Sequence, residues 1–404
     1  MPERAIVPMK RTVHLTNAKV GEPYVGVVEI EGVKSLRMEE PSVPWLTLDG
    51  NSGKLVGTPP GSGDFQIRLQ GLLNSERVQV LAHLAVIPDP RSLWVNKDSD
   101  RNDPFWKPNE AFERLDGDLL CVAASKRGRS HAKDGGFRDD DFGLSVTGSG
   151  GWHIAVVADG AGSARFSRRG SRVAVQSVLQ ELPNLLEEHL TPDLSRLIQA
   201  RQQGHPEATT QIKSRLYQTL ATAGFNAAKA IEEEAKTKEQ SPSAFSTTII
   251  ICIAKPTPEG WFFAGFSIGD GGAAVFDIDD ASLTTLTLPD SGEFAGQTRF
   301  LHRSEFSGGF EEVAKRIFFD VRKHFTALIL MTDGITDPKF PTENVFANPE
   351  KWVQFWQQDL AKSVAFVATN TEMQKQFLEW LDFWSPGNHD DRTIAVLVPQ
   401  GSLP

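Results

Sequence analysis

Short alternating runs of apolar and polar residues fill the chain between about residues 11 and 88. Within these runs apolar residues tend to recur at every second position, and turns rich in glycine and proline separate one run from the next. A period of two is typical of strands that bury one face, and no long helical period interrupts it. Residues 11–88 are therefore predicted to form a small all-β sandwich.

After residue 118 the pattern changes to longer apolar runs mixed with helical periods. Runs of strand length are predicted at residues 119–124, 142–146, 152–158, 246–254, 261–268, 273–276, 327–331 and 393–398. Helical periods cover 167–189 and 207–238, and a third lies between 349 and 383. This mixture favours a layered α+β domain over residues 119–400. The stretch 89–118, which contains several prolines and little periodicity, is predicted to be a linker.

Composition narrows the class of protein. A hydrophobic fraction of 40% and a charged fraction of 23% are typical of a globular protein, and no apolar run reaches the length of a membrane span. The net charge of −10 argues against an extended nucleic-acid surface. Cys121 and Cys252 each lie in an apolar run and are predicted to be buried thiols, and the start lacks a secretory pattern, so a cytoplasmic location is expected.

Two aspartate–glycine pairs stand at the ends of apolar runs, at Asp159-Gly160 and, one residue after the run ends, at Asp333-Gly334. A strand buried on both faces cannot hold a carboxylate in its middle, but at the strand's end the carboxylate can enter a cleft and bind a cation. Aspartate–glycine is also a common turn dipeptide, so either pair alone is more often a turn than a metal site. Further acidic positions strengthen the metal hypothesis; they are Asp139, Asp140, Asp141, Asp270, Asp390 and Asp391.

The predicted ligands point to a particular kind of metal and reaction. Several carboxylates with few histidines favour Mg²⁺ or Mn²⁺ over zinc. Two such ions about 3.5–4 Å apart can activate a water and bind a phosphoryl oxygen, so that no protein nucleophile is needed. The chain has no Walker loop, no Gly-x-Ser-x-Gly elbow and no cysteine-centred phosphatase loop. Metal-assisted phosphoester hydrolysis is therefore the predicted chemistry.

The order of these motifs resembles the type 2C (PPM family) metal-dependent serine/threonine protein phosphatases. The resemblance is carried by residues 138–142, 157–163, 246–248, 268–270, 332–337 and 390–393. Residues 292–301 and the pair Ser130-His131 are similar to the bacterial branch of that family. Residues 44–65 resemble the immunoglobulin-like modules of bacterial proteins.

The resemblance implies a phosphatase-type β-sandwich flanked by helices, with two ions and a possible third in a cleft. It implies the following metal residues: Asp159 as the bridging ligand, Gly160 through its carbonyl, Asp333 and Asp390 on one ion, Asp139 or Asp140 near the other, and Asp270 with Asp337 for a weaker third ion. Its implied substrate is phosphoserine or phosphothreonine in a protein. Implied partners are a serine/threonine kinase and a von Willebrand A-type protein.

Two departures from the family pattern affect the expected catalytic groups. An arginine that holds the substrate phosphate in many members is missing near Gly135, so His131, Lys133 or Arg138 would supply the positive charge. Ala161 stands where eukaryotic members often have a proton-donating histidine. Two alternative functions stay open: a phosphatase-like sensor with little turnover, and a phosphoesterase for a small molecule.

Overall fold

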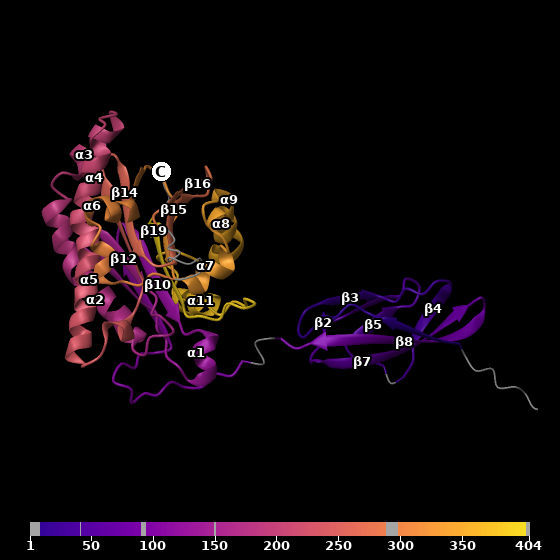
Figure 1. Ribbon diagram of the computed structural model, residues 1–404. Helices are drawn as coiled ribbons and strands as arrows, with labels where there is room; N and C mark the ends of the chain where they lie inside the picture. Colours follow the sequence, from indigo (N-terminus) through magenta and orange to yellow (C-terminus); the bar gives the residue numbers. More distant parts are fainter. Residues whose placement is uncertain (1–8, 41, 90–93, 149–150, 288–297, 401–404) are drawn as a thin grey trace, which may run out of the picture. The chain divides into compact units, whose positions relative to one another are not determined.

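The computed structural model describes residues 9–40, 42–89, 94–148, 151–287 and 298–400. The chain divides into two compact units, Met1–Trp94 and Val95–Pro404 (Figure 1). Within the described ranges, every helix is too short or too polar to reach across a lipid bilayer.

The first unit is all-β, as the alternating pattern predicts. A five-stranded sheet contains β1 (Met9–His14), β8 (Glu76–Ile87), β7 (Gly63–Leu73) and β4 (Val33–Met38) in that order, with β2 (Ala18–Lys19) paired to β8. A three-stranded sheet contains β3 (Tyr24–Val27), β6 (Lys54–Gly57) and β5 (Leu46–Asp49). Alternate residues such as Ile67 and Leu69 are buried in the core of this unit, which is the burial pattern of a sheet with one wet face.

The second unit contains two antiparallel sheets. The first has the strand order β16 (Ser282–Thr285), β15 (Gly272–Asp277), β18 (Ala327–Met331), β19 (Arg392–Pro399), β10 (Leu119–Lys126) and β9 (Glu110–Asp116). The second has the order β11 (Asp141–Val146), β12 (His153–Ala158), β13 (Ile249–Thr257), β14 (Gly260–Ile268) and β17 (Ile317–Arg322).

Helices cover the outer faces of both sheets, so the unit has four layers (Figure 1). One core packs α2 (Ser167–His189), α3 (Leu194–Gln202), α4 (Ala208–Leu216) and α5 (Thr222–Thr237) on the second sheet. Another packs α7 (Asp333–Lys339), α8 (Glu343–Phe346), α9 (Pro349–Phe355) and α11 (Met373–Trp380) on the first sheet. A third core, which includes Cys121, Val157 and Leu330, fills the space between the sheets. The predicted α+β class is confirmed.

The structure departs from the predicted elements at the sheet edges. Strands β9, β16 and β17 were not predicted, because each mixes charged and half-buried residues where one edge faces solvent. Strand β9 also lies inside the stretch 89–118 that was expected to be a linker, and it pairs with β10 along its whole length. The helix expected over 207–238 is interrupted by a π-helical turn at Tyr217–Ala221 between α4 and α5.

Candidate metal centre

Three aspartates from three strand ends meet at one place in the second unit. Asp159 follows β12 directly, Asp270 follows β14, and Asp333 is the first residue of α7 just after β18. One carboxylate oxygen from each lies within 4.8 Å of the others. The three aspartates therefore reach one place from both sheets, as expected for residues that follow the ends of buried strands.

The charge in this cluster is not balanced within the described part of the chain. The Oδ1 atoms of Asp270 and Asp333 are buried there without a hydrogen-bond partner. Burial and the adjacent Asp333 and Asp140 carboxylates raise the pKa of Asp159 well above its usual range. Burial and the Asp270 carboxylate do the same to the pKa of Asp333. A set of buried oxygen donors with excess negative charge fits a hard divalent cation.

The acidic triplet before β11 extends the cluster. Asp140 is 1% exposed, and its Oδ2 accepts a 2.9 Å hydrogen bond from the hydroxyl of Thr332. Burial, with the nearby Asp391 carboxylate, raises the pKa of Asp140 to about 7 and that of Asp139 to about 6. Both carboxyls thus belong to the same region of crowded negative charge.

The backbone around Asp159 is held by the two threonines that precede β13. The Asp159 N–H donates to Thr248 Oγ1 at 3.0 Å, and its carbonyl accepts from the Thr248 N–H and the Thr247 hydroxyl, both at 2.7 Å. These hydrogen bonds fix the backbone of Asp159, and with it the position from which its side chain extends.

The glycines after Asp159 and Asp333 allow close backbone approach rather than a turn. A Cβ on Gly160 would lie 2.6 Å from the carbonyl oxygen of Asp139, and one on Gly334 would lie 1.9 Å from that of Asp391. Neither glycine has a positive φ. The packing of other acidic segments against them favours the metal interpretation of these pairs over the simple bend.

Asp391 holds the acidic segments together, a role that the sequence, which indicated it only as one more acidic position, did not predict. Its side chain is 2% exposed and accepts from the N–H groups of Gly128 at 2.6 Å, Asp140 at 3.2 Å and Asp139 at a shorter distance. Its own N–H donates to Asp390 Oδ1 at 2.8 Å. The adjacent doublet Asp390-Asp391 was the available signal.

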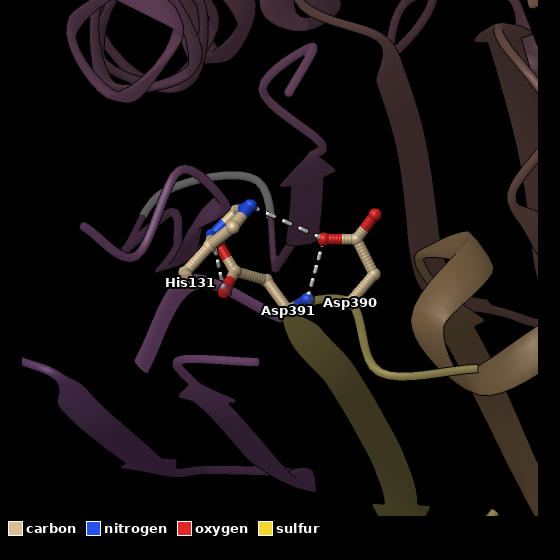
Figure 2. Close-up of side chains that lie close together, drawn as sticks. All are labelled: His131, Asp390 and Asp391. Atoms are coloured by element: carbon tan, nitrogen blue, oxygen red, sulfur yellow. Dashed lines mark hydrogen bonds and ion pairs between the residues drawn. The ribbon is translucent and has the colours of Figure 1, made fainter. Parts of the chain in front are cut away.

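His131, on α1 (Arg129–Asp134), lies between two of these carboxylates (Figure 2). Its Nδ1 is 3.2 Å from Asp391 Oδ1 and its Nε2 is 3.7 Å from Asp390 Oδ1. Burial alone would lower the pKa of His131, but the Asp391, Asp139 and Asp390 carboxylates outweigh it and raise the pKa to about 10. The imidazole is therefore a cation in the metal-free protein at neutral pH.

Arg138 does not face the open side of the site, which corrects the expectation that it binds phosphate. It is 1% exposed, and its guanidinium donates to the Pro108 carbonyl at 3.1 Å, the Ser125 hydroxyl at 2.7 Å and the Asp140 carbonyl at 2.7 Å. These inward bonds leave the side chain no access to a substrate.

The remaining predicted residues lie at the rim or beyond it. Asp390 keeps 51% of its side chain exposed, and Lys133 and Asp337 are exposed. Residues 292–297 of the bacterial-type motif lie outside the described residues, whereas Thr298 donates its hydroxyl to Asp270 Oδ2.

Comparison with known proteins identifies one family model and several solved structures. The model described as protein phosphatase 2C matches residues 127–382, which is more than half of the chain. RsbX in complex with magnesium is 12% identical over 72% of this chain and 100% of its own, with a TM-score of 0.36. The Mycobacterium tuberculosis serine/threonine phosphatase PstP/Ppp is 16% identical over 70% and 99%, with a TM-score of 0.39. The S. agalactiae serine/threonine phosphatase is 13% identical over 72% and 99%, with a TM-score of 0.38. No curated protein matches.

Proposed function

Because the chain belongs to the protein phosphatase 2C family of metal-dependent serine/threonine phosphatases, we propose that two Mg²⁺ or Mn²⁺ ions bind in its carboxylate cluster and serve the hydrolysis of phosphoserine and phosphothreonine in proteins. The proposed ligands are Asp139, Asp140, Asp159, Gly160, Asp270, Asp333 and Asp390. The observation that carries the proposal is the convergence of Asp159, Asp270 and Asp333 within 4.8 Å, with buried and unpartnered carboxylate oxygens.

Three of the proposed ligands have positions that suit the roles proposed for them. Asp159 lies against both Asp140 and Asp333, which suits a bridging carboxylate. Gly160 brings its backbone next to Asp139, and half-exposed Asp390 is open to solvent at the rim. Bound Mg²⁺ or Mn²⁺ would lower the pKa of a water and polarise the phosphoryl oxygens.

His131 is the proposed source of positive charge and of a proton for the leaving group. A Cβ on Gly162 would lie 4.0 Å from its Nε2, so the ring adjoins the loop that follows Asp159. The buried Ala161 has no group that could donate a proton. His131 can therefore hold a proton at Nε2 beside the cluster, at the side where half-exposed Asp390 lies.

Replacing His131 with alanine should slow cleavage of a phosphoserine peptide far more than that of p-nitrophenyl phosphate. A serine alkoxide needs a proton to depart, whereas nitrophenolate leaves as the anion, and general-acid help is worth about 10²–10⁴-fold. The rates of both substrates at saturating Mn²⁺ give the comparison, with exposed His205→Ala as the control. An equal loss on both substrates would assign His131 a role in holding Asp391 instead.

We also propose that the all-β unit is a separate module and that the catalytic unit starts at Val95. The Arg127 guanidinium donates to Asn96 Oδ1 at 2.6 Å and to the Lys97 carbonyl at 2.8 Å, so residues just after 94 are part of the second unit. A shortened chain that begins at Val95 should fold and cleave p-nitrophenyl phosphate about as fast as the full chain. A chain that begins at Pro104 should have a lower melting temperature than the chain that begins at Val95. An inactive Val95 chain would show that the β module completes the site.

We also propose a cellular compartment and partners for the enzyme. Buried, unpaired Cys121 and Cys252 are compatible with a reducing, cytoplasmic compartment. We propose the all-β module as the docking site for a serine/threonine kinase or a von Willebrand A-type partner. Assays of a phosphoserine peptide and a small phosphate ester, each with Mn²⁺ and with EDTA, separate a protein phosphatase from a small-molecule phosphoesterase and from a sensor without turnover.

A further inference from the structure

A fully buried lysine lies next to the acidic triplet of the candidate metal centre. Lys107 is 1% exposed and belongs to the segment that precedes β9, where the sequence indicated only a linker. Removing an ammonium group from water costs several kcal/mol unless strong partners replace the water. The groups that replace water around the Lys107 ammonium group therefore indicate its role.

The ammonium group of Lys107 contacts the acidic triplet, residues 139–141, and Ser171, whose hydroxyl also hydrogen-bonds to the triplet. Nζ donates to the Asp140 carbonyl at 2.5 Å, to the Asp139 carbonyl at 3.4 Å and to the Ser171 hydroxyl at 3.4 Å. It also forms a 3.2 Å ion pair with Asp141 Oδ2. Ser171, on α2, donates its hydroxyl to the same Asp139 carbonyl. One lysine thus contacts three consecutive residues.

The triplet is held from two directions. On the carbonyl side, the Asp140 oxygen accepts from both Lys107 and Arg138. On the amide side, the N–H groups of Asp139 and Asp140 donate to Asp391. With both backbone sides bound, the Asp140 carboxylate points to Thr332 Oγ1 and toward Asp159.

We propose that Lys107 is a positioning residue for the metal centre, which sets the backbone from which Asp139 and Asp140 present their carboxylates. This inference rests on the proposed function, since it takes these two aspartates as part of the metal site. It makes the segment before β9 a component of the catalytic unit. Groups that orient metal ligands without touching the ion typically account for 10–100-fold in metal affinity.

The test replaces Lys107 with methionine, which has similar length and no charge. Asp141 keeps its other partner, Arg172 at 3.3 Å, so the variant should stay folded in EDTA. Calorimetric titration with Mn²⁺ should show an affinity about 10–100-fold weaker than wild type. Turnover should be lost at low Mn²⁺ and largely recovered at saturating Mn²⁺, which a general packing defect would not produce. Exposed Lys375→Met on α11 is the matched control.

Wild-type Mn²⁺ affinity in Lys107→Met would overturn the inference. If the methionine variant does not fold, Ser171→Ala decides, because it removes the hydroxyl that donates to the Asp139 carbonyl and accepts from Lys107 Nζ, and leaves both backbones and the lysine in place. A weaker Mn²⁺ affinity in Ser171→Ala supports the positioning role, and wild-type affinity overturns it. A wild-type chain that binds no Mn²⁺ would overturn the proposed function, and this inference with it.

Discussion

Replacement of Asp159 with asparagine is expected to reduce phosphate release by about 10²–10³-fold or more, the scale associated with loss of a group that stabilises developing charge. The amide keeps the shape of the side chain but removes the negative charge that two cations would share. Asp159 lies against both Asp140 and Asp333, which is the position proposed for the bridging ligand. Turnover of a phosphoserine peptide at saturating Mn²⁺ is the measurement.

The same variant should be at least as stable as wild type without metal. Burial and neighbouring carboxylates raise the pKa of Asp159, so this residue costs the metal-free fold stability as the pH rises above the unfolded pKa of about 3.9. Asparagine removes this repulsion, and the melting temperature in EDTA at neutral pH should stay equal or rise. Mn²⁺ should stabilise wild type by about 2.7 kcal/mol at a hundredfold excess over its Kd, and the variant much less. Exposed Asp279→Asn is the control; wild-type turnover in Asp159→Asn would contradict the bridging role.

Replacement of Asp391 with asparagine should destabilise the second unit by about 3–5 kcal/mol, the usual cost of breaking a buried charged network. The carboxylate accepts from three backbone N–H groups and faces the His131 ring, whereas an amide has one acceptor oxygen and turns an N–H₂ toward donors. Urea unfolding in EDTA measures the loss. Asp390→Asn is the matched control, because half of that side chain is exposed; it should weaken Mn²⁺ binding with little effect on stability. Equal stability of the two variants would contradict the role given to Asp391.

The stability difference between wild type and Asp391→Asn should depend on pH in EDTA. The pKa of Asp391 is lowered because, against the effect of burial, His131 and backbone N–H groups favour its ionised form. Its contribution is therefore present above its unfolded pKa of about 3.9 and is lost as the pH falls through the folded value. His131 contributes fully below its unfolded pKa of about 6.5 and loses its contribution as the pH rises through about 10. The difference should be largest between these two unfolded pKa values and shrink toward pH 10; a flat difference would contradict the ion pair.

The sequence predicted the aspartates that end strands, because a strand-length apolar run followed by Asp is a local pattern. Asp159 follows such a run directly and Asp333 follows one after Thr332, and the structure brings them together with Asp270. It also predicted the long helix at residues 167–189, whose period is sustained over 23 residues. Local pattern was sufficient in these cases because the strands are buried on both faces and end where a charged residue appears, and the helix has one periodic buried face.

The roles that the sequence missed depend on partners far along the chain. Asp391 accepts from Gly128, 263 positions away, and Lys107 donates to Asp140, 33 positions away. No local periodicity carries such information. Arg138 was assigned to the substrate because its charge is visible in the sequence, whereas its burial beside Ser125 is not. Strand β9 was taken as linker because an edge strand with glutamates and an arginine lacks a clear alternation.

The most direct test of the account is phosphate release from a phosphoserine peptide by the full chain, first stripped with EDTA and then titrated with Mn²⁺. The account predicts no release in EDTA and a rate that rises to saturation as Mn²⁺ fills the site formed by Asp159, Asp270 and Asp333. Release in EDTA at the rate seen with Mn²⁺, or no release at any Mn²⁺ concentration, would contradict it.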